Sequence, residues 1–224
     1  MIDFDNYSYG YTEILRENLG MFGRDIDYYA EYKIKIILKN TVSYPNRILD
    51  YGCGVGRHIP FFLKYFPNAE IWGCDISEHS LKTAETLNPD QNFFSLNRYD
   101  FISKKEFFDL ILVSNVFHHI THEMRVHEMR KIKGFLKSSG ELFVFEHNPY
   151  NPITRHIVNR CPFDFDAMLL KPSEMKTLLI KNKFNIFKKR YSLFFPSALK
   201  KFQCLDEFLG LIPMGGQYYF HAEK

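Results

Sequence analysis

The sequence predicts an α/β protein built on a parallel sheet, and three observations support this fold class. Short apolar runs alternate with helical patterns over residues 46–147, as in repeated β–α units. These runs are rich in Ile, Leu, Val and Phe, as buried parallel strands are. A turn with three glycines, Gly52, Gly54 and Gly56, follows the first run. In open parallel sheets this turn is the usual point of ligand contact.

The expected strands and helices follow from the same patterns. We expect strands at 47–52, 70–75, 92–96, 109–115 and 140–148. The expected helices are 28–40, 57–66, 77–87 and one that begins at Thr121. Ser77 is a suitable N-cap for the third helix. The fourth helix carries Val126, Met129, Ile132 and Leu136 on one face, which predicts that it packs on the sheet.

The regular alternation stops after residue 148. The Pro- and Asn-punctuated stretch 148–166 is interpreted as a loop with one helical turn. Pro172 opens a further helix to about residue 182, and two strand-like segments follow at 184–195 and 217–224. Such a long insertion beside the sheet is usually functional or disordered, and its apolar content disfavours disorder.

The composition restricts the class of partner. The 224 residues are 46% apolar, which predicts one globular domain, and 29 Lys and Arg against 26 Asp and Glu give a net charge of +3. This charge is too small to indicate nucleic-acid or membrane binding by bulk electrostatics. Four dispersed cysteines indicate neither a disulfide framework nor a zinc ribbon. Because no leader or membrane-length apolar run is present, we expect a cytoplasmic protein.

The glycine turn selects between two kinds of ligand. A dinucleotide-binding loop has the pattern G-x-G-x-x-G, whose third glycine here would be position 57, which is Arg57. The pattern present is D-x-G-x-G-x-G, from Asp50 to Gly56. A carboxylate just before the turn repels a pyrophosphate and suits a ligand with a cationic end. A nicotinamide-dependent oxidoreductase is therefore disfavoured.

Residues 47–148 resemble the class I S-adenosylmethionine-dependent methyltransferases, which carry this motif at the same strand-to-helix turn. The resemblance implies S-adenosylmethionine as cofactor, with its methionine part wrapped by the glycine loop. Asp75, which ends the stretch EIWGCD, would hold the ribose hydroxyls, and Ile76 would lie against the adenine. Asp100 matches the acid that contacts the adenine amino group, and Asn115 and Val116 would lie near the methionine end.

The resemblance also implies a complete Rossmann-like fold. It predicts a seven-stranded, mostly parallel sheet with an antiparallel last strand and helices on both faces. Residues 1–45 are then an N-terminal helical cap and residues 46–224 the methyltransferase domain, within a single globular body. Tyr7, Tyr9 and Tyr11 in the cap either contact the sulfonium through their rings or pack on the sheet.

Candidate catalytic and substrate residues lie at the expected strand ends. Glu146 and His147 end the fifth strand, and an unperturbed imidazole has a pKa that suits proton transfer. We hypothesise that His147 is the base or positions the substrate; alternatively, the pair is a polar strand end that bonds the following loop. The substrate candidates are His118, His119, Asn148 and Arg155. Arg155 and the asparagines either bind an anionic group or pack the loop.

Two further possibilities concern metals and large substrates. His119 and Glu123 share helical spacing, but histidines beside a helix start usually face solvent, so no metal site is predicted. The favoured function is methyl transfer to a small molecule. An RNA or protein methyltransferase is the alternative, supported only by Lys and Arg clusters at 181–190 and 200–201.

Overall fold

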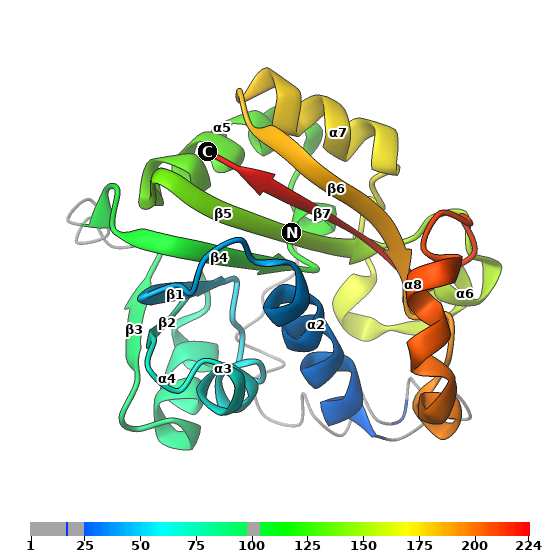
Figure 1. Ribbon diagram of the computed structural model, residues 1–224, viewed down its shortest axis with the longest axis horizontal. Coiled ribbons are helices and arrows are strands. Elements are labelled where there is room, and N and C mark those ends of the chain that lie inside the picture. Colours follow the sequence, from blue (N-terminus) through cyan, green and yellow to red (C-terminus); the bar gives the residue numbers. More distant parts are fainter. Residues whose placement is uncertain (1–16, 18–24, 98–103) are drawn as a thin grey trace.

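The computed structural model describes Glu17, residues 25–97 and residues 104–224, and these contain one seven-stranded sheet (Figure 1). The strand order is β3-β2-β1-β4-β5-β7-β6. The strands are β1 (Arg47–Tyr51), β2 (Glu70–Asp75), β3 (Asn92–Ser95), β4 (Phe108–Ser114), β5 (Leu136–His147), β6 (Asn185–Ser192) and β7 (Gln217–Glu223). Only β7 runs against the other strands of this sheet, because both of its pairings are antiparallel. The sheet predicted from the resemblance is confirmed.

Helices cover both faces of the sheet. The α-helices are α2 (Ile26–Asn40), α3 (Ile59–Tyr65), α4 (Glu78–Leu87), α5 (His122–Phe135), α6 (Pro152–Arg160), α7 (Pro172–Lys181) and α8 (Asp206–Leu209). Short 3-10 segments are η4 (Phe117–His119), η5 (Pro162–Asp164) and η6 (Ser197–Leu205). Ile34 and Ile37 of α2 share a buried cluster with Phe62 of α3, and Met129 of α5 shares another with Met175 of α7. Two cores therefore lie on opposite faces of the sheet.

The helical part of the expected N-terminal cap packs on the sheet directly. Ile34 and Ile37 are fully buried against Ile48 of β1. Asp25 caps α2 by accepting a hydrogen bond from the Tyr28 N–H at 3.0 Å. Helix α2 therefore belongs to the layer that includes α3.

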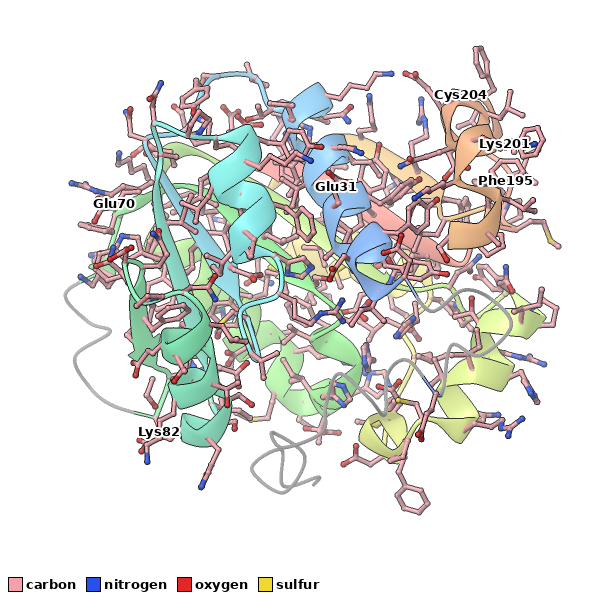
Figure 2. The ribbon with its side chains drawn as sticks, turned by 90° about the horizontal axis from the view of Figure 1, so that it is seen from below. Glu31, Glu70, Lys82, Phe195, Lys201 and Cys204 are labelled. Atoms are coloured by element: carbon pink, nitrogen blue, oxygen red, sulfur yellow. The ribbon has the colours of Figure 1, made fainter. Side chains whose placement is uncertain are left out.

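The segment between β6 and β7 is attached to α2 by two tyrosines. The Tyr28 hydroxyl donates to the carbonyl of Phe195 at 3.2 Å, and the Tyr32 hydroxyl donates to Asp206 at 2.5 Å. Figure 2 shows Glu31 on α2, between α3 and the segment that contains Phe195 and η6. This segment and α3 therefore flank α2 on its two sides.

Two segments differ from the sequence expectation. Stretch 148–166 contains the nine-residue helix α6 instead of a single turn, because Asn151 accepts hydrogen bonds from the N–H groups of Ile153 and Thr154. Strand β5 begins at Leu136, which was assigned to the preceding helix. Phe108 pairs with Leu136 while Leu110 pairs with Glu141, so residues 137–140 bulge out of an already paired strand.

No helix in the described part of the chain is both long and apolar enough to span a bilayer.

Candidate active site

The glycine turn folds tightly against the end of β2, and at Gly52 there is no room for a side chain. The N–H groups of Gly52 and Cys53 both donate to the carbonyl of Cys74, at 2.8 and 3.0 Å. Gly52 has a φ of +73°, and a Cβ there would lie 2.5 Å from a methyl of Val116. Glycine is therefore required at position 52 by conformation and by space.

Gly54 differs, because it faces open space. Its φ is +53°, yet a Cβ built there meets nothing within 4 Å. Its N–H donates to Asp75 Oδ2 at 2.8 Å, while the Ser77 N–H donates to Asp75 Oδ1 at 2.9 Å. Burial raises the pKa of Asp75, and the backbone donors oppose that rise. Asp75 thus joins the glycine turn to the end of β2 and keeps lone pairs for a ligand hydroxyl.

Asp50 presents a carboxylate oxygen that the protein does not satisfy. Its Oδ2 lies 3.0 Å from His58 Nδ1. Its Oδ1 is buried and has no hydrogen-bond partner in the described residues. Because a buried carboxylate oxygen without a donor is costly, this atom indicates a site for a cationic or N–H-bearing group.

Lys33 of α2 approaches the same region. Its side chain is buried, and burial together with the charge of Arg57 lowers its pKa to about 8, against the opposing influence of Asp50 and Glu146. An amino group that senses both carboxylates lies near the carboxyl ends of β1 and β5. The two acids oppose the lowering of its pKa but do not overcome it.

Glu146 holds the loop after β4 in place. One carboxylate oxygen accepts from the N–H groups of Val116 and Phe117, at 3.1 and 2.7 Å. The other lies 2.7 Å from His118 Nδ1. Burial raises the pKa of Glu146, but the charge and hydrogen bond of His118 outweigh this and bring it below its ordinary value. The geometry therefore indicates a positioning role for Glu146 more than proton transfer.

His118 is enclosed between two acids. Its Nε2 lies 3.3 Å from Asp164 Oδ1, and its ring is 1% exposed. Burial opposes its charge, but Glu146 and Asp164 raise its pKa to about 9. Burial alone would raise the pKa of Asp164; the hydrogen bond from His118 and the nearby imidazoles lower it to about 2. At neutral pH the three groups form a cation between two carboxylates.

His147 lies next to this group. Its ring centroid is 5.1 Å from that of His118. Burial and the charge of His118 lower the pKa of His147 to about 4, so the imidazole is neutral at pH 7. A general base works best with a pKa near the operating pH. The environment therefore favours substrate positioning over proton abstraction for His147.

The other predicted site residues have different positions. Asn115 has a φ of +58° and accepts from Gln217 Nε2 at 3.0 Å, and Val116 packs over Gly52. Ile76 is 48% exposed at the end of β2. The His119 Nε2 lies 3.5 Å from Asp164 Oδ1. Glu123, which shares helical spacing with His119, is exposed in the first turn of α5.

Asn148 and Arg155 do not join the site in the way that the sequence indicated. The Asn148 amide donates to the carbonyls of Pro213 and Gly215, at 3.2 and 2.7 Å, and its oxygen accepts from the Tyr150 N–H. Its polar atoms thus support the turn before β7. Arg155 is exposed on α6. Asp100 and the tyrosines at positions 7, 9 and 11 lie outside the described residues.

Sequence reasoning missed three residues of the site: Lys33, His58 and Asp164. Lys33 carried a signal, because it follows Tyr32 on the buried side of an otherwise apolar helix segment. Asp164 carried a weaker one, an acid in the aromatic stretch after Cys161. His58 had no signal, since its pairing with Asp50 depends on the turn between them.

Comparison with known proteins agrees with this geometry. A family model described as "Methyltransferase domain" matches residues 49–142, from β1 into β5. The chain contains a class I S-adenosylmethionine-dependent methyltransferase domain. The cofactor of this domain is S-adenosylmethionine, and the unsatisfied Asp50 oxygen, the open space at Gly54 and the Asp75 carboxylate fit that molecule's ammonium and ribose groups.

A curated protein matches part of this chain. A trans-aconitate 2-methyltransferase of Rhodopseudomonas palustris is 27% identical over 100 residues, which is 45% of this chain and 38% of that protein. The match thus spans well under half the length of this curated relative.

Solved structures share the fold. A methyltransferase from Archaeoglobus fulgidus has a TM-score of 0.67 at 16% identity, covering 90% of this chain and 96% of that one. A possible histamine N-methyltransferase from Thermotoga maritima has a TM-score of 0.67 at 18% identity, covering 99% and 97%.

Proposed function

We propose that the protein transfers a methyl group from S-adenosylmethionine to a small-molecule acceptor. The observation that carries this proposal is the Asp75 carboxylate, which bridges the Gly54 N–H and the Ser77 N–H beside open space. The bound cofactor supplies an electrophilic methyl group on a sulfonium. Because the leaving group is a neutral thioether, the protein mainly aligns the reactants and excludes water.

The proposal gives a task to each of four side chains of the site. Asp75 accepts hydrogen bonds from the ribose hydroxyls, and Asp50 attracts the cationic methionine end. Glu146 fixes residues 116–118, and so sets the floor of the acceptor pocket. His147, whose pKa is lowered to about 4, keeps a neutral imidazole beside this loop, 5.1 Å from the His118 ring. We place the reaction in the cytoplasm, since the four cysteines are too dispersed in the sequence to indicate a disulfide framework.

A small anionic acceptor is favoured over a macromolecule. Lys33, with a pKa of about 8, remains mostly charged at pH 7 while buried near the strand ends. A buried ammonium attracts a carboxylate or phosphate strongly. The Rhodopseudomonas relative is named for a carboxylate substrate, trans-aconitate, which supports the same acceptor class.

Calorimetric titration tests the cofactor first. The protein is titrated with S-adenosylmethionine, S-adenosylhomocysteine and NADH. We expect the first two to bind, and Asp75→Ala to weaken them about 10- to 100-fold, since hydrogen bonds to a charged group contribute about 1.5–3 kcal/mol. Asp90→Ala removes an exposed carboxylate and is the matched control. Preferential binding of NADH would overturn the proposal.

A methyl-transfer screen then tests the acceptor. Purified protein and radiolabelled cofactor are incubated with three panels: di- and tricarboxylic acids, amines, and bulk RNA. Label in the carboxylic-acid panel that depends on Lys33 supports the small anionic acceptor. Label only in RNA would contradict the proposed acceptor and leave the cofactor assignment intact.

A further inference from the structure

A group of metal-ligand side chains gathers at the carboxyl ends of β4 and β5. His118, His147 and Asp164 each bring one ligand atom to within 4.8 Å of the other two. They come from η4, β5 and η5, which are separated in the sequence. The fold therefore brings these three residues together, and no local spacing motif in the sequence indicates them.

The orientation of His118 is the one that metal-bound imidazoles usually have. Its Nδ1 is held 2.7 Å from Glu146 Oε2, which leaves Nε2 directed toward Asp164 at 3.3 Å. A ligating histidine almost always gives its other ring nitrogen to a carboxylate or carbonyl. Two atoms bound tetrahedrally to one ion at about 2.0–2.1 Å lie about 3.3 Å apart. The His118–Asp164 separation already matches this value.

Glu146 makes this orientation rigid. It is fully buried, and its second oxygen accepts from two backbone N–H groups of residues 116 and 117. His118 therefore cannot turn without losing its hydrogen bond to a carboxylate that the loop after β4 holds in place. Such a fixed outer partner is typical of a built site more than of a chance contact.

His147 completes the set from the end of β5. Its ring centroid lies 5.1 Å from that of His118, and its ligand atom lies within 4.8 Å of those of His118 and Asp164. The side chain is half-buried. An ion placed among the three ligand atoms would therefore be within reach of the His147 imidazole.

We propose that His118, His147 and Asp164 bind one divalent transition-metal ion. Two imidazoles and one carboxylate suit Zn²⁺, Fe²⁺ or Mn²⁺, whereas Mg²⁺ prefers an all-oxygen shell. Three protein ligands leave coordination positions open, as in metal sites that bind a substrate. Binding uses the His118 Nε2 lone pair and releases the proton that this nitrogen holds toward Asp164.

The role of the ion rests on the proposed function, although its binding does not. Its open position would hold an oxygen of the acceptor, and a bound divalent ion makes such an oxygen release its proton to solvent more readily. That oxygen then forms a bond to the methyl carbon as the carbon–sulfur bond breaks, and the sulfur keeps the electron pair as a neutral thioether. The predicted acceptor is therefore an oxygen nucleophile.

Calorimetry with metal salts tests the site. The full chain is freed of metals with a chelator, then titrated with ZnCl₂, MnCl₂ and MgCl₂. We expect one Zn²⁺ per chain and no Mg²⁺ binding. Glu146→Gln keeps an acceptor for the backbone donors and should weaken Zn²⁺ about 10- to 100-fold, as loss of an outer partner does. Asp164→Asn and His147→Ala should weaken it further.

Two controls separate this inference from the proposed function. His156→Ala removes an exposed histidine of α6 and should leave Zn²⁺ binding unchanged. Asp75→Ala should lose S-adenosylhomocysteine and keep Zn²⁺. Thermal melting and S-adenosylhomocysteine binding confirm that the ligand variants are folded. Absence of Zn²⁺ binding by the parent, or equal binding by Asp164→Asn and His147→Ala, would overturn the metal site and leave methyl transfer standing.

Discussion

Two glycines of the same turn have different physical reasons for being glycine. At Gly52 a side chain would meet Val116, whose β-branched side chain has little rotamer freedom, whereas at Gly54 it would enter open space. Both have positive φ, which costs about 1–2 kcal/mol for other residues. A side chain at position 52 should therefore lower the stability of the fold, whereas one at position 54 should obstruct the ligand.

This difference predicts opposite outcomes for two alanine variants. Gly52→Ala should lower the free energy of unfolding by about 2–4 kcal/mol, the sum of positive φ and overpacking against Val116. Gly54→Ala should lose only about 1–2 kcal/mol, but weaken S-adenosylhomocysteine at least about 10-fold because its methyl fills the cofactor space. Urea unfolding and calorimetry measure the two effects. Equal affinities of Gly54→Ala and the parent would contradict the assignment of that space.

Lys33 should favour acceptor turnover while its buried charge lowers the free energy of unfolding. Its pKa is lowered from 10.5 to about 8, and one pKa unit corresponds to about 1.4 kcal/mol, so its buried charge costs about 3 kcal/mol below pH 8. Lys33→Met should raise the free energy of unfolding by up to that amount at pH 7 while acceptor turnover falls.

The Lys33 effect has a defined pH dependence. Because the folded pKa lies below the unfolded one, the penalty is complete below pH 8 and disappears as the pH rises from 8 to 10.5. The gain from Lys33→Met should shrink over this range. Lys82→Met, at an exposed position of α4, is the control. A gain that is the same at pH 7 and pH 10 would mean that lost charge is not its cause.

For single residues, the sequence identified those whose role depends on nearby residues in the chain. It missed those that reach the site only through tertiary folding. The glycines and Asp75 follow directly from turn geometry after a strand, so spacing alone located them. Asp164 reaches His118 only because η5 returns to the end of β4, which no spacing rule reports. For Asn148 the sequence left two roles open, because a polar strand end has the same pattern whether it bonds a substrate or a turn; its hydrogen bonds favour the turn.

At the scale of elements, strands were predicted better than their connections. Buried parallel strands are short apolar runs with clear ends, so β1, β2 and β4 can be located from the sequence pattern alone. Helix α6 was missed because Pro152 was interpreted as a breaker, whereas in the first turn of a helix proline is favoured. The early start of β5 depends on pairing with Phe108, which is a tertiary contact.

One carboxylate makes polar contacts between α2 and α3, beside their apolar packing. Glu31 accepts from Lys64 and the Tyr65 hydroxyl, both at 2.7 Å, and from Lys35 at 3.0 Å. The hydrogen bonds of Lys64 and Tyr65 lower the pKa of Glu31 to about 2. Since α2 carries Lys33, this contact also holds the lysine over the strand ends.

The Glu31 contact predicts an acid-sensitive stability. A carboxyl whose folded pKa is lowered stabilises the protein above its unfolded pKa of 4.5, and this stabilisation is lost as the pH falls toward 2. Glu31→Gln should therefore lower the free energy of unfolding by about 1 kcal/mol at pH 7, after allowance for solvent screening. Near pH 2.5 the difference should vanish. Glu85→Gln, an exposed position on α4, should show no such pattern in urea unfolding.

For the whole molecule, the strand order explains why the site residues meet. The carboxyl ends of β1, β2, β4 and β5 share one edge of the sheet, because these strands are parallel neighbours. Asp50, Asp75 and the residues around Glu146 meet at that edge, although Asp50 and Glu146 are almost 100 residues apart in the sequence. A ligand that contacts several strand ends therefore joins parts of the chain that otherwise separate on unfolding.

This arrangement predicts a global response to cofactor. S-adenosylhomocysteine at 100 times its Kd should add about 2.7 kcal/mol to the free energy of unfolding, by mass action on the folded state. For a chain of this size each kcal/mol shifts Tm by about 2–4 °C, so a rise of about 5–10 °C is expected in a thermal melt. Gly54→Ala should remove about half of this rise or more at the same ligand concentration, because a 10-fold weaker affinity leaves about 1.4 kcal/mol. Asp90→Ala should retain the full rise. A parent protein whose Tm stays within a degree, at a concentration where calorimetry shows saturation, would mean that the ligand binds folded and unfolded chains alike and does not bridge the strand ends.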